Sequence, residues 1–189
     1  LQVAERLERV APPDLVRLKY QELFVPRENL LGEVGQGFKI AMQTLELFRM
    51  TVGAAAMGIG QAALDASLTH VRSRRQFGKA LSDFQSIRMK LADMATELQA
   101  ARSLVYLAAL GKDAQNQSLA KDASMAKLYA TEAAFRVVDQ AVQIHGGRGV
   151  LKGSTTERLY REIRALRIYE GASEIQKLII AHQLLGPSK

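Results

Sequence analysis

The feature that most constrains what this chain can fold into is the near absence of proline beyond its first 26 residues. Only four prolines occur in 189 residues, and three of them precede residue 27. Proline breaks helices because it lacks a backbone N–H and clashes with the preceding turn. Hydrophobic residues make up 48% of the chain but aromatic residues only 6%, so Ala, Leu, Ile and Met supply the apolar mass. This combination favours packed helices over sheets.

The first 34 residues differ from the rest. Val16, Leu18 and Tyr20 alternate with polar residues, and this period of two predicts a strand. A lone strand or hairpin is marginal in water, so we expect its sheet to belong to a preceding region. The first residue is Leu1 and not Met, which predicts that the chain starts partway through a longer protein.

From residue 35 onward the pattern is helical. A first long helix is predicted over about residues 37–72. Ser82 and Gln85 have the S-x-x-Q spacing of a capping box and predict the start of a second helix, which Gly111 is expected to end. Apolar residues of this second helix recur in alternating steps of three and four, as in the seam of a bundle: Phe84, Ile87, Leu91, Met94, Leu98, Ala101, Val105 and Ala108.

A polar linker at residues 115–118 leads to a third predicted helix, which ends at Gly146-Gly147. Its apolar stripe consists of Ala126, Ala130, Ala133, Val137, Ala141 and Ile144.

Two shorter helices follow, each opened by a predicted capping box. Ser154 and Glu157 begin the first of them, and Ser173 and Gln176 begin the last, which runs through Leu185. Three long antiparallel helices and a broken fourth element predict an all-α fold, an up-down-up-down four-helix bundle.

The predicted division places a short N-terminal β remnant and linker at residues 1–34 and a helical bundle domain at residues 35–189.

Composition excludes several kinds of site. The chain has no cysteine, and its three histidines lack a paired spacing, so we expect no metal site. No run of about eighteen apolar residues appears, which predicts no membrane span. The net charge of +7 is compatible with a solvated surface or with a phosphate-bearing ligand. No basic helix face with interleaved aromatic residues supports nucleic-acid binding.

The stretch from Tyr169 to Gln176, Y-E-G-A-S-E-I-Q, places Glu170 just before a predicted helix N-terminus. The helix dipole favours a carboxylate there, although a lone Glu in this position is often only a surface residue. Gly171 would let another group approach closely, and the N–H groups that open the next helix can receive an anion or a polar cofactor edge.

Two further stretches are suited to a cofactor. The first, R-R-Q-F-G-K at residues 74–79, offers Arg74 for a bidentate contact with a phosphate. The second, Q-I-H-G-G at residues 143–147, places two glycines after a helix. Those glycines are either a plain C-cap or an opening for a cofactor edge. Each stretch alone is weak evidence.

Together these stretches resemble the acyl-CoA dehydrogenase family. The matching order is R-x-x-F-G-K, then F-Q, then Q-I-H-G-G, then Y-E-G-x-S-E-I-Q, and the segments 31–33 and 35–38 fit the family's entry into its C-terminal domain. The resemblance covers essentially the whole chain, from the last strands of a middle β-domain to the C-terminal helix.

The resemblance implies that Glu170 is the base that removes the α-proton of an acyl-CoA. Gln143, Gly146 and Gly147 would hold the FAD of a neighbouring subunit. The residues implied to contact FAD are Arg74, Phe77, Phe84, Gln85, Gln143, Gly146, Gly147, Ser173 and Glu174. Those implied to contact the substrate are Glu46, Arg49, Gly171 and His182. Ala172 and His182 replace a Thr and an Arg that are common in the family.

The implied reaction is FAD-dependent α,β-dehydrogenation of an acyl-CoA thioester to a trans-2-enoyl-CoA, with an electron-transfer flavoprotein as acceptor. The resemblance implies a homotetramer in the bacterial cytoplasm or the mitochondrial matrix, and a chain that is inactive without its missing domains. Two alternatives stay open, a structural oligomerisation module without cofactor binding of its own and a nucleic-acid-binding module.

Overall fold

The computed structural model describes residues 1–114 and 119–186, so the predicted linker at residues 115–118 lies outside the described part. The chain separates into two compact units, Leu1–Leu45 and Glu46–Lys189. Strand β1 (Gln2–Leu7) and strand β2 (Leu15–Lys19) of the first unit form an antiparallel pair, with Leu7 opposite Leu15. Strand β1 was not predicted because its apolar residues do not alternate. Both strands are exposed along their whole length, so this pair has no core of its own.

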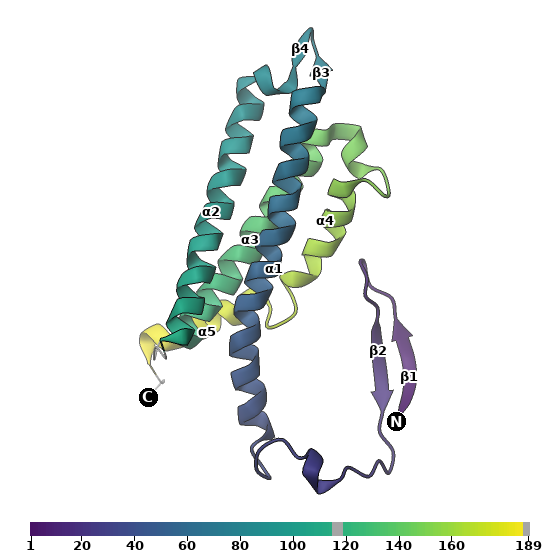
Figure 1. Cartoon of the computed structure of the whole chain (residues 1–189), viewed down its shortest axis with the longest axis vertical. Helices are drawn as coiled ribbons and strands as arrows, with labels where there is room; N and C mark the ends of the chain where they lie inside the picture. The colour runs from purple at the N-terminus through teal and green to yellow at the C-terminus, as the bar shows by residue number, and fades with distance from the viewer. Residues whose placement is uncertain (115–118, 187–189) are drawn as a thin grey trace. The chain divides into compact units, whose positions relative to one another are not determined.

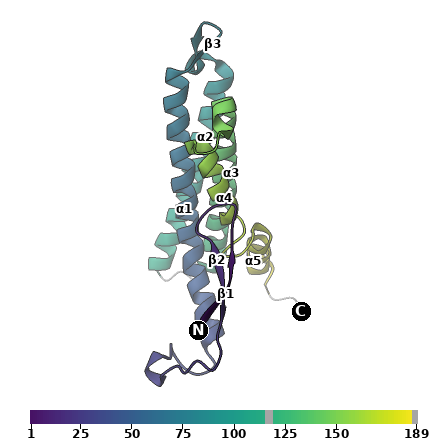
Figure 2. The same cartoon turned by 90° about the vertical axis from the view of Figure 1, so that its right-hand side faces the viewer.

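The second unit is the predicted helical bundle. Helix α1 (Gly37–Ser73) enters it at Glu46 and is followed by α2 (Gln85–Asp113), α3 (Leu119–His145), α4 (Thr155–Leu166) and α5 (Ser173–Leu185). Within this unit, α1, α2 and α3 run side by side in alternating directions, and α4 returns beside α3 (Figures 1 and 2). The predicted fold class is therefore confirmed, with α4 and α5 as the broken fourth element.

Short elements connect the helices. The hairpin of β3 (Arg75–Gln76) and β4 (Lys79–Ala80), followed by the 3-10 helix η2 (Leu81–Asp83), joins α1 to α2. The 3-10 helix η3 (Gly146–Val150) joins α3 to α4. One further 3-10 helix, η1 (Arg27–Asn29), belongs to the first unit.

The core forms where small residues let the helices approach closely. Gly60 on α1 is buried, and a Cβ atom there would lie 2.6 Å from Leu98 Cδ2 of α2. Gly53 is similarly tight against Val105. The predicted stripe of α3 is buried at every position, and that of α2 is buried from Met94 onward. The periodicity of the sequence thus identified the inward faces of both helices.

Two predicted helix signals were wrong. Ser82 lies inside η2, and α2 begins at Gln85 after Phe84 without a side-chain cap. The capping group here is Asp83, whose Oδ2 accepts a hydrogen bond from the Ala80 N–H at 3.1 Å and stabilises a 3-10 turn before α2 begins. Gly111 does not end α2, because the helix continues to Asp113.

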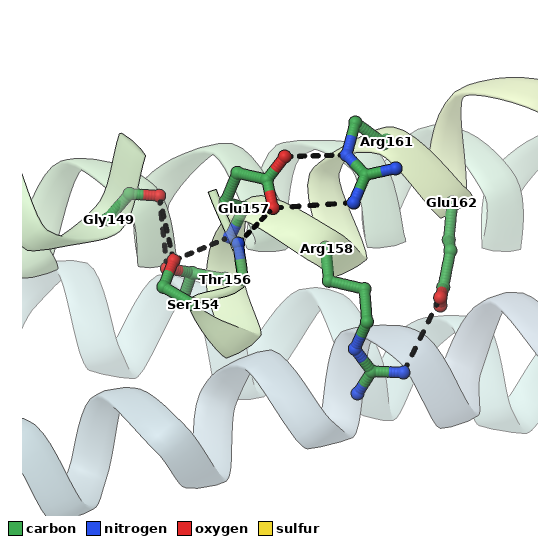
Figure 3. Close-up of polar contacts among 8 residues, drawn as sticks. Gly149, Ser154, Thr156, Glu157, Arg158, Arg161 and Glu162 are labelled. Carbon is green, nitrogen blue, oxygen red and sulfur yellow. Dashed lines mark hydrogen bonds and ion pairs between the residues drawn. The ribbon is translucent and has the colours of Figure 1, made fainter. Parts of the chain in front are cut away.

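The start of α4 confirms the predicted cap (Figure 3). Ser154 Oγ accepts a hydrogen bond from the Glu157 N–H at 3.3 Å, and the Glu157 carboxylate accepts from the Gly153 N–H at 3.1 Å. The same carboxylate pairs with Arg161 one turn later. Together these contacts fix the point at which the chain turns from η3 into α4.

Helix α1 passes a length-and-composition test for a membrane span within the described residues, but half of its apolar window is buried in the structure. The core helix of a soluble protein passes the same test, so the absence of a span stays a prediction.

We expect the Leu98→Ala variant to lower the free energy of unfolding by about 2–5 kcal/mol, because it leaves a cavity against Gly60 in the core. Leu98 is 3% exposed, whereas Leu107 on the same helix is 66% exposed. Leu107→Ala is therefore the matched control, with an expected change within about 0.5 kcal/mol. Urea denaturation of the two variants measures the difference, and equal losses would show that α2 is packed differently.

Candidate functional site

Glu170 lies in a strained turn between α4 and α5. Its φ is +57° and that of Gly171 is +89°, and non-glycine residues rarely adopt the left-handed region. Glu170 Oε2 is buried without a hydrogen-bond partner among the described residues, and the Glu170 N–H has no acceptor there either. A strained residue that offers one free acceptor and one free donor is typical of a functional position.

Two side chains hold the carbonyl groups of this turn. The Gln176 amide, from the first turn of α5, donates to the Glu170 and Gly171 carbonyl oxygens at 3.0 Å each. The Lys127 ammonium, from α3, donates to the Gly171 carbonyl oxygen at 2.8 Å. Burial lowers the pKa of Lys127 to about 8, although the negative charges of Glu132 and Glu170 act against this shift.

A second polar group ties the same turn to α3. Glu132 accepts hydrogen bonds from Ser173 Oγ and from the Arg167 guanidinium, and the Arg167 group also lies over the Phe135 ring at 4.6 Å. The predicted cap role of Ser173 is therefore wrong: Ala172 is the N-cap of α5, and the Ser173 hydroxyl is used for Glu132 instead. Burial raises the pKa of Glu132, but the hydrogen bonds from Ser173 and Arg167 outweigh it and lower that pKa below its ordinary value.

Arg49 on α1 completes this region. Its side chain is buried and its Nε has no hydrogen-bond partner among the described residues. Burial lowers the pKa of Arg49, while the charges of Glu46 and Glu170 raise it, which places both carboxylates within electrostatic range. Residues predicted from separate motifs are thus connected here. Arg49 is electrostatically coupled to Glu46 and Glu170, and Gly171 follows Glu170 in the chain.

A second region lies at the other end of α1. His70, Arg74, His145, Gly147, Arg148 and Leu151 line a cavity of about 350 Å³. The His70 and His145 rings stack with their centroids 4.3 Å apart. Burial lowers the pKa of His70, and the charges of His145, Arg148 and Arg74 lower it further. Because two guanidinium groups line one small cavity, it is suited to an anionic ligand.

The β3–β4 hairpin presents aromatic residues beside this region. Phe77 is 91% exposed at its tip, in a left-handed conformation with φ +49°, and its ring meets the Phe84 ring edge-on at 6.3 Å. Lys79 Nζ lies 4.2 Å from the centre of the Phe84 ring. Gln85 is exposed at the first position of α2.

Gly147 has no conformational or packing reason within the chain to be glycine. Its φ is not in the left-handed region, and no described atom outside its own stretch of backbone lies within 4 Å of the position its Cβ would take. Gly146 has equally open space but needs its positive φ of 58° to end α3. The open backbone at Gly147 faces the cationic cavity, so a ligand edge fits there.

The two regions are too far apart to form one small site in a single chain. Arg49 and Ser73 are 24 residues apart on α1, which corresponds to about 36 Å at a rise of 1.5 Å per residue. Three predicted site residues, Gln143, Glu174 and His182, are exposed, and no side-chain hydrogen bond links them to either region in the described structure.

Sequence reasoning missed Lys127, Glu132 and Gln176 as parts of the site. Gln176 was identified only as a capping residue. A signal for Lys127 was present, because Ser124, Lys127 and Thr131 form a second inward stripe on α3 beside the predicted one, and all three are fully buried. A lysine on an apolar stripe needs a partner.

The comparisons with known proteins agree with this fold. Residues 35–185 match the family model described as acyl-CoA dehydrogenase, C-terminal domain, and the chain belongs to that family. It is 48% identical over 168 residues to the short-chain specific acyl-CoA dehydrogenase, mitochondrial, of Sus scrofa, covering 89% of this chain and 41% of that protein.

A second relative is the caffeyl-CoA reductase-Etf complex subunit CarC of Acetobacterium woodii, which is 46% identical over 87% of this chain and 43% of its own length. A similar solved structure is an acyl-CoA dehydrogenase complexed with FAD from Bacillus anthracis, with a TM-score of 0.90 and 31% identity, covering 97% of this chain and 35% of that one. The chain therefore spans less than half the length of these relatives.

The Glu132 network predicts a pH-dependent stability. Because the folded-state pKa of Glu132 lies below its ordinary value of 4.5, its ionised form stabilises the fold above pH 4.5, and this contribution is lost as the pH falls through the folded-state pKa. We expect Glu132→Gln to lower the free energy of unfolding by about 1.5–3 kcal/mol at pH 7. The difference from the parent should shrink towards pH 3.

Denaturation at several pH values checks this expectation. Glu174→Gln is the control, because Glu174 is an exposed carboxylate on α5. A Glu132→Gln deficit that is the same at pH 7 and pH 3 would show that shape, and not charge, explains the role of Glu132.

Proposed function

We propose that this chain is the C-terminal part of an FAD-dependent acyl-CoA dehydrogenase that converts an acyl-CoA thioester to a trans-2-enoyl-CoA. The observation that carries the proposal is the buried, unpartnered carboxylate oxygen of Glu170 on its strained turn. Residues 1–34 would be the end of the middle β-domain, and residues 35–189 the helical bundle domain. Activity is expected only with the further domains that such enzymes contain.

Glu170 is the proposed base. The α-hydrogens of an acyl-CoA are weakly acidic, so their removal needs a carboxylate with a free lone pair in a site from which water is excluded. Glu170 Oε2 provides that lone pair. The free Glu170 N–H is suited to donate to the thioester carbonyl oxygen, which accumulates negative charge as the proton leaves. One residue thus offers both the base and a carbonyl donor.

The substrate would approach along α1 and α5. Arg49 is buried near Glu170 and Glu46 and has an unused Nε donor, which is suited to a polar group of the substrate. Gly171 follows the base, and a Cβ atom there would lie 2.5 Å from Gln176 Nε2, so only glycine fits the turn. His182 is exposed on α5, in the position proposed for contact with the CoA end.

FAD would supply the acceptor for the hydride that leaves the β-carbon. The residues present fit such a ligand: the cavity beside Arg74 and Arg148 is cationic, and Gly147 leaves open space beside it. Arg74 and Phe77 would bind the pyrophosphate and adenosine end of FAD. Phe84 and Gln85 would form a second pair of contacts with the cofactor. Ser173 and Glu174 would lie beside the flavin that serves Glu170.

Assembly would be part of the active site. Because the two regions lie about 36 Å apart along α1, we propose that Gln143, Gly146 and Gly147 bind the FAD of a neighbouring subunit within a homotetramer. Ala54, Ala55 and Gly58 on the exposed face of α1 would allow another helix to approach closely. An electron-transfer flavoprotein is the proposed electron acceptor. The proposed location is the bacterial cytoplasm or the mitochondrial matrix, since the relatives include a bacterial and a mitochondrial protein.

We expect Glu170→Gln in the complete enzyme to slow flavin reduction by acyl-CoA by about 10²–10⁴-fold while FAD stays bound, because the amide keeps the shape and loses the base. Stopped-flow bleaching of the flavin measures the rate. Glu46→Gln is the comparison, because Glu46 is the other carboxylate near Arg49. Loss of the reaction in Glu46→Gln with a normal rate in Glu170→Gln would place the base on α1.

We expect Arg74→Ala to weaken FAD binding about ten- to a hundredfold, the loss of one charge-assisted pair. Arg75→Ala is the matched control, because the Arg75 guanidinium donates to the Gly78 carbonyl oxygen within the hairpin and does not line the cavity. The flavin content of the purified variants measures the difference, and equal retention in both would contradict the role of Arg74.

A further inference from the structure

Lys127 occupies an unusual position for a lysine. Its side chain is completely buried on α3, and the one hydrogen bond it makes among the described residues is to the Gly171 carbonyl oxygen, 44 positions later in the chain. Lysine is rarely buried without a partner, because the desolvated ammonium is costly. The fold retains a buried cation at this point, directly beneath the turn that carries Glu170.

The charges around Lys127 come from α1, from α3 and from the segment between α4 and α5. Glu132 lies on its own helix, Arg167 and Glu170 lie between α4 and α5, and Arg49 lies on α1. The two carboxylates favour the ammonium form, and the two guanidinium groups oppose it. Lys127 and Glu170 are therefore electrostatically coupled, although no hydrogen bond joins their side chains.

We propose that Lys127 is a positioning residue for proton abstraction by Glu170. Its ammonium holds the Gly171 carbonyl group and, through it, the turn that aims the Glu170 carboxylate. This inference rests on the proposed function, in which Glu170 is the base.

Gln176 alone cannot fix the turn against the bundle. Its single neutral amide is divided between the carbonyl groups of Glu170 and Gly171, and it belongs to α5, the element that the turn itself leads into. Lys127 belongs to α3, so its bond connects the turn to the bundle core. A charge-assisted hydrogen bond is also roughly twice as strong as a neutral one.

Accurate placement of the base matters for the rate more than for substrate binding. A misplacement of about 1 Å at a reacting group can cost roughly a hundredfold in rate. If Lys127 only filled space, its replacement would affect folding and flavin retention. It would not lower the rate of the chemical step while leaving substrate affinity unchanged.

The test is Lys127→Met in the complete holoenzyme, since methionine removes the charge and the donor at similar volume. Lys90→Met is the matched control, because Lys90 on α2 also donates to a residue of α3, Gln140, away from the turn. Four quantities are measured: the flavin content, the limiting rate constant of flavin reduction, the Kd for a short-chain acyl-CoA, and the amide hydrogen exchange of residues 169–173.

We expect Lys127→Met to retain its flavin and to lose at least about tenfold in the limiting rate constant, while its Kd for the acyl-CoA changes by less than about threefold. The amides of residues 169–173 should exchange faster than in the parent. Lys90→Met should match the parent in all four quantities. A parent-like rate constant or parent-like exchange in Lys127→Met would overturn the inference.

If Lys127→Met does not fold, Lys127→Arg decides. It keeps the cation and the donor, so we expect it to stay within about threefold of the parent rate constant, as a charge-assisted bond is preserved. A folded Lys127→Arg enzyme with a much larger loss would refute the role. The two possible failures can be told apart. If the proposed function is wrong, Glu170→Gln reduces its flavin at a normal rate. If only the role of Lys127 is wrong, Glu170→Gln is inactive and Lys127→Met has a normal rate constant.

Discussion

Burial of α3 on two adjacent stripes is the constraint on which the rest of the bundle depends. Its buried residues occur largely as neighbouring pairs, such as Ala126 with Lys127 and Ala133 with Ala134. One residue of each pair continues the predicted stripe, and the other forms the second inward stripe. Because most of these side chains are small, helices on both sides approach closely. Helices α2, α4 and α5 and the 3-10 helix η3 each pack directly against α3.

The helices were predictable because their periodicity is a local property of the sequence. The buried stripes of α2 and α3 and the end of the last helix all follow from spacing alone. The caps were less predictable, because a hydroxyl has several possible partners. Ser154 caps α4 as its spacing indicates, whereas Ser173 bonds to Glu132 on another helix. Strand β1 was missed because its sequence lacks alternation.

The site could be predicted only where a contiguous motif carries it. Glu170 follows from such a motif, and the structure adds its strain and its free carboxylate oxygen. Lys127 could not be connected to Gly171 from the sequence, because 44 residues separate them and only the packing of α3 brings them together. The same holds for Arg74 and Gly147, whose shared cavity depends on how α1 and α3 end.

The hairpin tip at Phe77 affects how much conformational entropy is lost when a partner binds there. The β3–β4 hairpin extends beyond the ends of α1 and α2 (Figure 1). The Phe77 backbone is in the left-handed region, and its ring meets the edge of the Phe84 ring. A tight turn whose backbone is already restricted loses less backbone conformational entropy when a partner covers its side chain. A larger share of the free energy from desolvating the Phe77 ring therefore remains available to the complex.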